Sequence, residues 1–325
     1  MAFGRGRWMV GAALALGLAG CDGTPMVTPD GGPVVTDGGS VPQLDPLAAW
    51  EEQGSGDDAM FVSRSLDYAC RGARTRPTPG APVTTTFQLR DFEDDFEVDD
   101  AEVWVFNDNV IADDCSNAAT CTAITTDGSG NASLMLPAGG WYAYRVIPKP
   151  GFNPMLTVFG VFQYNEPAPL VAGEAVTGNS VSGSTIEVIP ATLGITRSEG
   201  LAIVAGRIED CAGGFVENAI IRLYDPNGDP VVAQPSGPFF HYFNGDAAHN
   251  VPAQAETDSN ADGLYVLAEL PVVSDGPYRI EAWGNLDGEL RILGCESARI
   301  FEDSVTILNL GPIREDAPEG CPPAQ

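Results

Sequence analysis

Apolar and polar residues alternate along several short stretches of the chain, and Gly, Asn, Asp and Pro bound these stretches. The alternation covers residues 84–89, 98–106, 126–137 and 141–146 in the first half, and 202–208, 216–224, 257–267 and 278–283 in the second half. A period of two residues places every second side chain on one face, so these stretches predict half-buried antiparallel strands. A weak pattern at residues 48–52 predicts one short helix.

The stretches follow the same order in both halves of the chain, which is the mark of a duplicated β domain. We therefore predict an all-β protein of two tandem antiparallel β-sandwiches. The first is expected over residues 47–195, including an N-terminal extension, and the second over residues 196–325. Residues 233–254 form an insertion in the second sandwich.

The second half also carries a recognisable residue pattern. Its elements are Val216, Ala219 and Ile221 on one strand, then Thr257, Asp258, Gly263, Tyr265 and Leu267, then Gly276 and Tyr278. This pattern resembles the carboxypeptidase regulatory-like domains, which are transthyretin-like seven-stranded sandwiches. The resemblance covers roughly residues 84–190 and 200–311 and is looser in the first half, where Ala132 replaces a large side chain. It implies the fold and an accessory or adhesive role. It does not single out one function, because the same fold serves many functions.

The N-terminus has the pattern of an export signal. Arg5 and Arg7 precede an apolar run over residues 8–20, which is too short to span a bilayer and ends at Cys21. Residues 1–20 are therefore predicted to be a signal peptide. Residues 21–46 are rich in Gly, Pro and Asp and predict a disordered, flexible tether.

Leu18, Ala19, Gly20 and Cys21 resemble the lipobox of bacterial lipoproteins. The resemblance implies that Cys21 becomes the first mature residue, carries a thioether-linked diacylglyceryl group and a further acyl chain such as palmitate, and has the lipid bilayer as its partner. Such an anchor predicts a cell-envelope location, at the outer membrane or cell surface. The alternative is an ordinary secretory signal, with Cys21 as a disulfide partner.

Charge narrows the set of partners. Removing residues 1–20 takes the formal net charge from −29 to −31. Such a chain is repelled by nucleic acid and by anionic head groups, so no nucleic-acid partner is expected. Residues 91–100 are mostly acidic and predict a solvated loop, with loose cation binding as the alternative.

Six cysteines remain after Cys21, and an even number in an exported chain predicts disulfides. Three lie in each half, so an odd number of bridges must join the halves if all are paired. We predict the pairs Cys115–Cys121, Cys211–Cys295 and Cys70–Cys321.

One turn matches the spacing of a calcium-binding loop. Asp258, Asn260, Asp262 and Glu269 occupy the ligand positions of an EF-hand loop, and Gly263 occupies its sharp turn. The flanking helices of an EF-hand are missing, and Glu269 follows what looks like a strand. The sequence therefore leaves two readings open, a turn-bound calcium and an ordinary hairpin turn.

The insertion contains an aromatic cluster made of Phe239, Phe240, His241, Tyr242 and Phe243. As a loop it would suit a protein or carbohydrate partner. The alternative, which we favour, is that the rings pack back over an open end of the second sandwich.

Nothing in the sequence supports catalysis. The chain lacks the G-x-S-x-G, H-E-x-x-H and Gly-rich phosphate-loop motifs, and His241 and His249 suit neither a zinc site nor a triad. The sequence predicts a non-catalytic surface module that is structural, adhesive or ligand-binding. The alternatives are a carbohydrate-binding protein and an unrecognised hydrolase.

Overall fold

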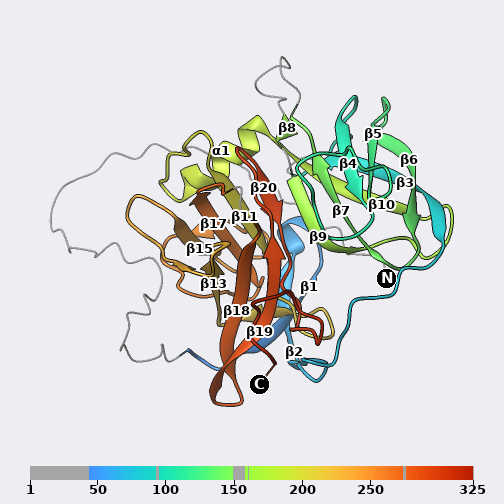
Figure 1. Cartoon of the computed structure of the whole chain (residues 1–325). Helices are drawn as coiled ribbons and strands as arrows, with labels where there is room; N and C mark the ends of the chain where they lie inside the picture. Colours follow the sequence, from blue (N-terminus) through green and yellow to red (C-terminus); the bar gives the residue numbers. More distant parts are fainter. Residues whose placement is uncertain (1–43, 93–94, 149–157, 160, 274–275, 325) are drawn as a thin grey trace.

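The computed structural model describes residues 44–92, 95–148, 158–159, 161–273 and 276–324 of the 325-residue chain. Strands make up nearly all of the regular structure in this part of the chain, with one α-helix and one short 3-10 helix (Figure 1). The predicted all-β fold is confirmed. The predicted signal peptide and Cys21 lie outside the described residues.

The first sandwich is built from two sheets. One sheet has the strand order β6-β3-β10-β8, and the facing strands have the order β9-β7-β4-β5. The strands are β3 Pro82–Asp91, β4 Glu102–Phe106, β5 Cys121–Thr125, β6 Asn131–Pro137, β7 Trp141–Val146, β8 Val158–Phe159, β9 Val161–Pro167 and β10 Ala175–Ser182.

The second sandwich has the strand orders β16-β15-β17-β11-β20 and β14-β13-β18-β19. Its strands are β11 Ala202–Arg207, β12 Phe215–Glu217, β13 Ala219–Tyr224, β14 Pro230–Val231, β15 Phe239–Phe243, β16 Pro252–Ala253, β17 Leu264–Leu270, β18 Tyr278–Leu286, β19 Glu289–Ala298 and β20 Val305–Ile307. Strand β12 lies apart from these sheets and pairs with the N-terminal extension.

The two sandwiches repeat one topology. In the first, β3 lies between antiparallel β6 and parallel β10; in the second, β11 lies between antiparallel β17 and parallel β20. On the facing sheets, β4 lies between β5 and β7, as β13 lies between β14 and β18. Strands β15 and β16 belong to the insertion and extend the sheet beyond β17.

A single sheet of nine strands runs through both sandwiches. Strand β20 of the second sandwich pairs in parallel with β9 of the first, with Val305 opposite Val161 and Ile307 opposite Gln163. In Figure 1 these two strands lie side by side at the junction between the green and the orange parts of the chain. The pairing joins the two sandwiches edge to edge through backbone hydrogen bonds.

The N-terminal extension contains β1 Ala48–Gln53, the 3-10 helix η1 Gly56–Asp58 and β2 Met60–Arg64. The short helix predicted at residues 48–52 is wrong, because this segment is strand β1 and pairs with β2 and β12. Trp50 fixes it by donating a hydrogen bond from Nε1 to Glu217 Oε2 at 2.7 Å. The extension, which we grouped with the first sandwich, therefore pairs with a strand from the second half of the chain.

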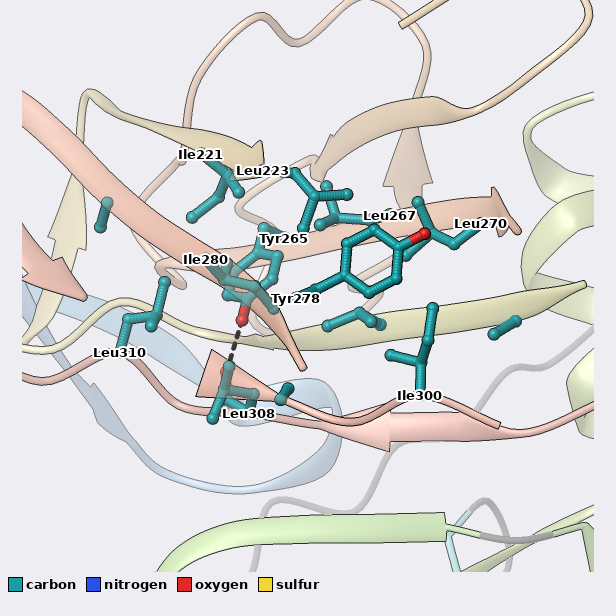
Figure 2. Packing of buried hydrophobic residues seen from close by; sticks show 14 of the residues in the cluster. Ile221, Leu223, Tyr265, Leu267, Leu270, Tyr278, Ile280, Ile300, Leu308 and Leu310 are labelled. Atoms are coloured by element: carbon teal, nitrogen blue, oxygen red, sulfur yellow. Dashed lines mark hydrogen bonds between the residues drawn. The ribbon is translucent and has the colours of Figure 1, made fainter. Parts of the chain in front are cut away.

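The first sandwich has its own hydrophobic core, whereas the core cluster of the second continues into buried residues of the first, such as Phe106 and Ala143. The core of the first includes Phe87, Leu89 and Tyr144, and that of the second includes Leu267, Tyr278 and Ile280. Figure 2 shows the second core, in which the Tyr265 hydroxyl donates a hydrogen bond to the Leu308 carbonyl oxygen. Gly206 permits this close approach, because a Cβ there would lie 1.9 Å from the same oxygen.

Three disulfides brace the described part of the chain. Cys115 pairs with Cys121, as predicted. The other two predicted pairs are wrong, because Cys70 pairs with Cys211 and Cys295 pairs with Cys321. The N-terminal extension carries Cys70 to the loop after β11, and the C-terminal segment folds back on β19. One bridge joins the halves, so the expected odd number is confirmed.

A third apolar cluster lies on the outer face of the β17-β11-β20 sheet. Helix α1, Gly183–Thr192, connects the two sandwiches and covers this face with Ile186, and Leu193 follows it. Val181 of β10 joins the same cluster. Elements at the C-terminal end of the first sandwich, β10 and α1, therefore cover the outer face of the second.

Candidate functional sites

The proposed calcium turn lies between β16 and β17 and is held mainly by Ser259. The fully buried Ser259 hydroxyl donates to the Val216 carbonyl oxygen at 2.7 Å and accepts from the Ala219 N–H at 3.0 Å. Asp262 is also fully buried, and its Oδ1 accepts from the Leu264 N–H at 2.8 Å. The turn is therefore fitted into the break between β12 and β13.

Burial raises the pKa of Asp262, and the hydrogen bond from Leu264 opposes that shift. Burial also raises the pKa of Asp258. The Asn260 amide donates to the Phe243 carbonyl oxygen at 2.6 Å. Asn260 and one carboxylate oxygen of Asp262 are thus bonded to the backbone, whereas Oδ2 of Asp262 is buried without a hydrogen-bond partner among the described residues.

Glu269 does not reach this turn. It lies at the far end of β17, where roughly 3.3 Å per residue carries it about 20 Å from Gly263. A bulge there gives Glu269 a φ of 58°, and both carboxylate oxygens accept from the Ser198 N–H, at 2.9 and 3.1 Å. Glu269 therefore fixes the segment that leads into β11.

Among the described residues, no three His, Cys, Asp or Glu side chains are grouped closely enough to hold a metal ion. Calcium binding by Asp258, Asn260 and Asp262 stays a prediction.

The aromatic cluster at residues 239–243 forms strand β15, so its description as a loop is wrong. Tyr242 and Phe243 are buried, and Phe239 and Phe240 are half-buried. The Tyr242 hydroxyl accepts a hydrogen bond from the Ile221 N–H of β13 at 2.8 Å. Packing of these rings against the second sandwich, the alternative that we favoured, is what the structure shows.

Replacing Tyr242 with Ser is expected to lower the free energy of unfolding by about 3–5 kcal/mol, the range for deleting a buried aromatic ring. Urea denaturation followed by circular dichroism measures this loss. Phe96, which is 68% exposed, provides the control, and Phe96→Ser is expected to change stability by less than about 0.5 kcal/mol. A similar small change for Tyr242→Ser would contradict the packing role.

The two histidines occupy different environments. His241 is buried on β15, where burial lowers the pKa of its imidazole. The His249 side chain is exposed, with Nδ1 3.9 Å from an oxygen of Asp246. Neither arrangement resembles a catalytic pair.

The acidic stretch at residues 91–100 is partly neutralised by Arg90. The guanidinium lies 3.5 Å from carboxylate oxygens of both Asp95 and Glu97. Residues 93–94 lie outside the described part of the chain. Loose cation binding by this stretch stays a prediction.

A buried ion pair lies where the C-terminal segment meets both sandwiches. Arg314 donates to Glu296 of β19, and the two side chains are only 6% and 8% exposed. The Arg314 guanidinium also stacks on Trp141 of β7, 4.4 Å from the ring centroid, and Arg76 stacks on the same ring at 5.0 Å. Burial raises the pKa of Glu296 to about 7, although Arg314 opposes the shift.

A cavity of about 220 Å³ lies beneath helix α1, and no sequence pattern predicts it. Residues of β10, α1, β11, β17 and β20 line it, together with Phe243 and the segment 250–252. It is bounded by elements of both halves of the chain.

No helix among the described residues is long and apolar enough to cross a membrane. No family model and no curated protein matches the chain. Solved structures that match include the TIE protein of Bacillus anthracis, the shaft pilin SpaA of Lactobacillus rhamnosus GG and the minor pilin GBS52 of Streptococcus agalactiae.

The sequence identities to these three are 14%, 12% and 10%, with a TM-score of 0.22 in each case. The matches cover 72%, 71% and 74% of this chain and 34%, 98% and 99% of the matched chains. The chain therefore spans about a third of the TIE protein and nearly all of each pilin. At these TM-scores the neighbours carry no argument about function, which has to be drawn from the chain itself.

Proposed function

We propose that this protein is an exported, lipid-anchored and non-catalytic module of the cell envelope. In this proposal Cys21 carries the acyl chains and the β-sandwiches form a rigid body for structural or adhesive contacts at the outer membrane or cell surface. The body stands away from the bilayer on the segment that precedes β1.

The observation that carries the proposal is how the N-terminal extension is fixed. It pairs with β12 through β1, and Cys70 bonds it covalently to Cys211. A segment that leads from a membrane anchor transmits load only if it is held firmly by the body. This extension has both a strand pairing and a covalent bond for that purpose.

The cysteines support export. All six that follow Cys21 are paired in three disulfides, and structural disulfides persist in oxidising compartments outside the cytosol. One of them, Cys295–Cys321, also ties down the C-terminal segment. A strongly acidic body that is braced by disulfides is suited to persist in an oxidising compartment outside the cytoplasm.

Mass spectrometry of the native protein's N-terminal peptide tests the anchor. The expected result is a chain that begins at Cys21 with a diacylglyceryl mass and an additional acyl mass. Replacing Cys21 with Ser is expected to move the protein from the membrane pellet to the soluble fraction or medium, because each buried methylene of an acyl chain contributes about 0.8 kcal/mol to membrane binding.

Asp22→Asn is the matched control, because it alters the neighbouring residue and leaves the thiol in place. It is expected to stay with the membrane pellet. An unmodified Cys21 thiol, or membrane retention of Cys21→Ser, would contradict the anchor.

A further inference from the structure

The cavity beneath α1 differs from the packed cores of the two sandwiches. It forms where helix α1 and strand β10 lie over the outer face of the β17-β11-β20 sheet without filling the space. Interiors are normally packed with few voids larger than a water molecule. This cavity is partly open to solvent, and its volume of about 220 Å³ is much larger than that of a water molecule.

The walls are mostly apolar. They include Val181 of β10, Val188 and Ile189 of α1, Leu264 of β17, and Val305 and Ile307 of β20. An apolar cavity does not hold water well and favours an apolar occupant. Because pockets for drug-sized molecules measure roughly 300–1,000 Å³, the occupant here must be smaller and slender.

Arg207 gives the cavity a single cationic side chain in its wall. Its guanidinium carbon lies 3.8 Å from the centroid of the Phe215 ring, so one face of the group is stacked. The Nε atom is buried and has no hydrogen-bond partner in the described part of the chain. Leaving a buried donor of a charged group unpaired is unfavourable unless something binds it.

Nearby carboxylates do not satisfy Arg207. Glu209, Asp262 and Glu52 interact with it electrostatically, but among the described residues no carboxylate oxygen lies within ion-pair distance of its nitrogens. Burial raises the pKa of both Glu209 and Asp262 and lowers that of Arg207. The guanidinium itself stays protonated at neutral pH.

The apolar walls and the unpaired Nε of Arg207 together define the ligand. We propose that the cavity binds a monocarboxylate with a short or medium-length hydrocarbon chain, with the chain among the aliphatic side chains and the carboxylate on Arg207. A carboxylate matches the planar donor fork of arginine and forms charge-assisted hydrogen bonds with it. No other charged side chain lines the cavity in the described structure.

Titration calorimetry of the full chain with octanoate at pH 7.5 tests the site. 1-Octanol is the matched neutral probe, because it has the same chain length and lacks the charge. Octanoate is expected to bind at least tenfold more tightly than octanol, since only its carboxylate gains the charge-assisted bonds to Arg207.

Two substitutions test the two parts of the site separately, the apolar walls that hold the hydrocarbon chain and the contact of the carboxylate with Arg207. Arg207→Met is expected to remove the preference for octanoate and leave octanol binding unchanged. Ala205→Phe places a ring in the cavity wall and is expected to abolish binding of both probes. Ala123→Phe adds the same ring at an exposed position on β5 and is expected to bind as the wild type does.

Circular dichroism shows which variants are folded before their binding is compared. If Arg207→Met does not fold, Ala205→Phe and the octanol comparison still decide the outcome. No heat from octanoate with the folded wild type, equal affinities for octanoate and octanol, or unchanged binding by folded Ala205→Phe would each overturn the proposal.

Discussion

When the oxidised protein is pulled by handles at Leu44 and Ala324, unfolding of the first sandwich is expected to add nothing to the measured contour length. Cys70–Cys211 closes a loop with a sequence separation of 141 residues, which contains β3 to β10, α1 and β11. Force applied at the ends passes through this bond. Unfolding inside the loop therefore adds no length.

The double variant Cys70→Ser/Cys211→Ser is expected to release that length. The Cys115–Cys121 bond inside the loop, with a separation of 6 residues, stays closed, so at about 3.3–3.6 Å per extended residue the contour length rises by roughly 450–490 Å. Single-molecule force spectroscopy measures the gain directly. The chain-entropy model also predicts that losing a loop of this size lowers the free energy of global unfolding by about 5 kcal/mol.

Cys295→Ser/Cys321→Ser is the matched control, because it opens a loop with a separation of only 26 residues. It is expected to add roughly 90 Å. If Cys70→Ser/Cys211→Ser gives the same contour length as the oxidised wild type, the load does not pass through the long-range disulfide.

Arg314→Met is expected to destabilise the protein by about 3–5 kcal/mol at pH 8, because it leaves the Glu296 carboxylate buried without its cation. The double variant Arg314→Met/Glu296→Leu is expected to recover most of this loss, since a buried ion pair can often be replaced by apolar residues. Urea denaturation at fixed pH measures both. A double variant as unstable as Arg314→Met would show that the charge is not the cause.

The same pair predicts a pH dependence with a definite sign. The pKa of Glu296 is raised to about 7 in the folded protein, above its usual value near 4.5, so the folded state holds this proton more tightly than the unfolded state. The contribution of Glu296 to stability is therefore greatest below about pH 4.5 and is lost as the pH rises through 7. Glu296→Gln removes the titrating group, and the difference between its stability curve and that of the wild type isolates this contribution.

Alternation of apolar and polar residues predicted the strands that hold the two cores. It did not predict α1, because this helix has several β-branched residues and an internal Pro190, which both disfavour a helix. The helix forms where Ile186 can pack on the outer face of the sheet. β10 was missed because Gly178 and its polar neighbours interrupt the pattern. Gly178 is required there, since a Cβ would lie 2.2 Å from the Phe87 ring.

Prediction from the sequence was limited in the same way for the candidate site residues. The spacing around Asp258 gave the turn correctly but could not show that Glu269 faces Ser198 instead. Cysteine counting required a bridge between the halves, but its partners depended on where the N-terminal extension packs. Arg207 looks like an ordinary outward-facing strand residue until α1 and β10 cover that face.

The parallel pairing of β20 with β9 has a consequence for how the repeated halves can exist. Each half, expressed alone, would present a strand edge that the other now covers, and such edges recruit further chains. The two sandwiches therefore depend on one another, and either half alone is expected to self-associate through its uncovered edge.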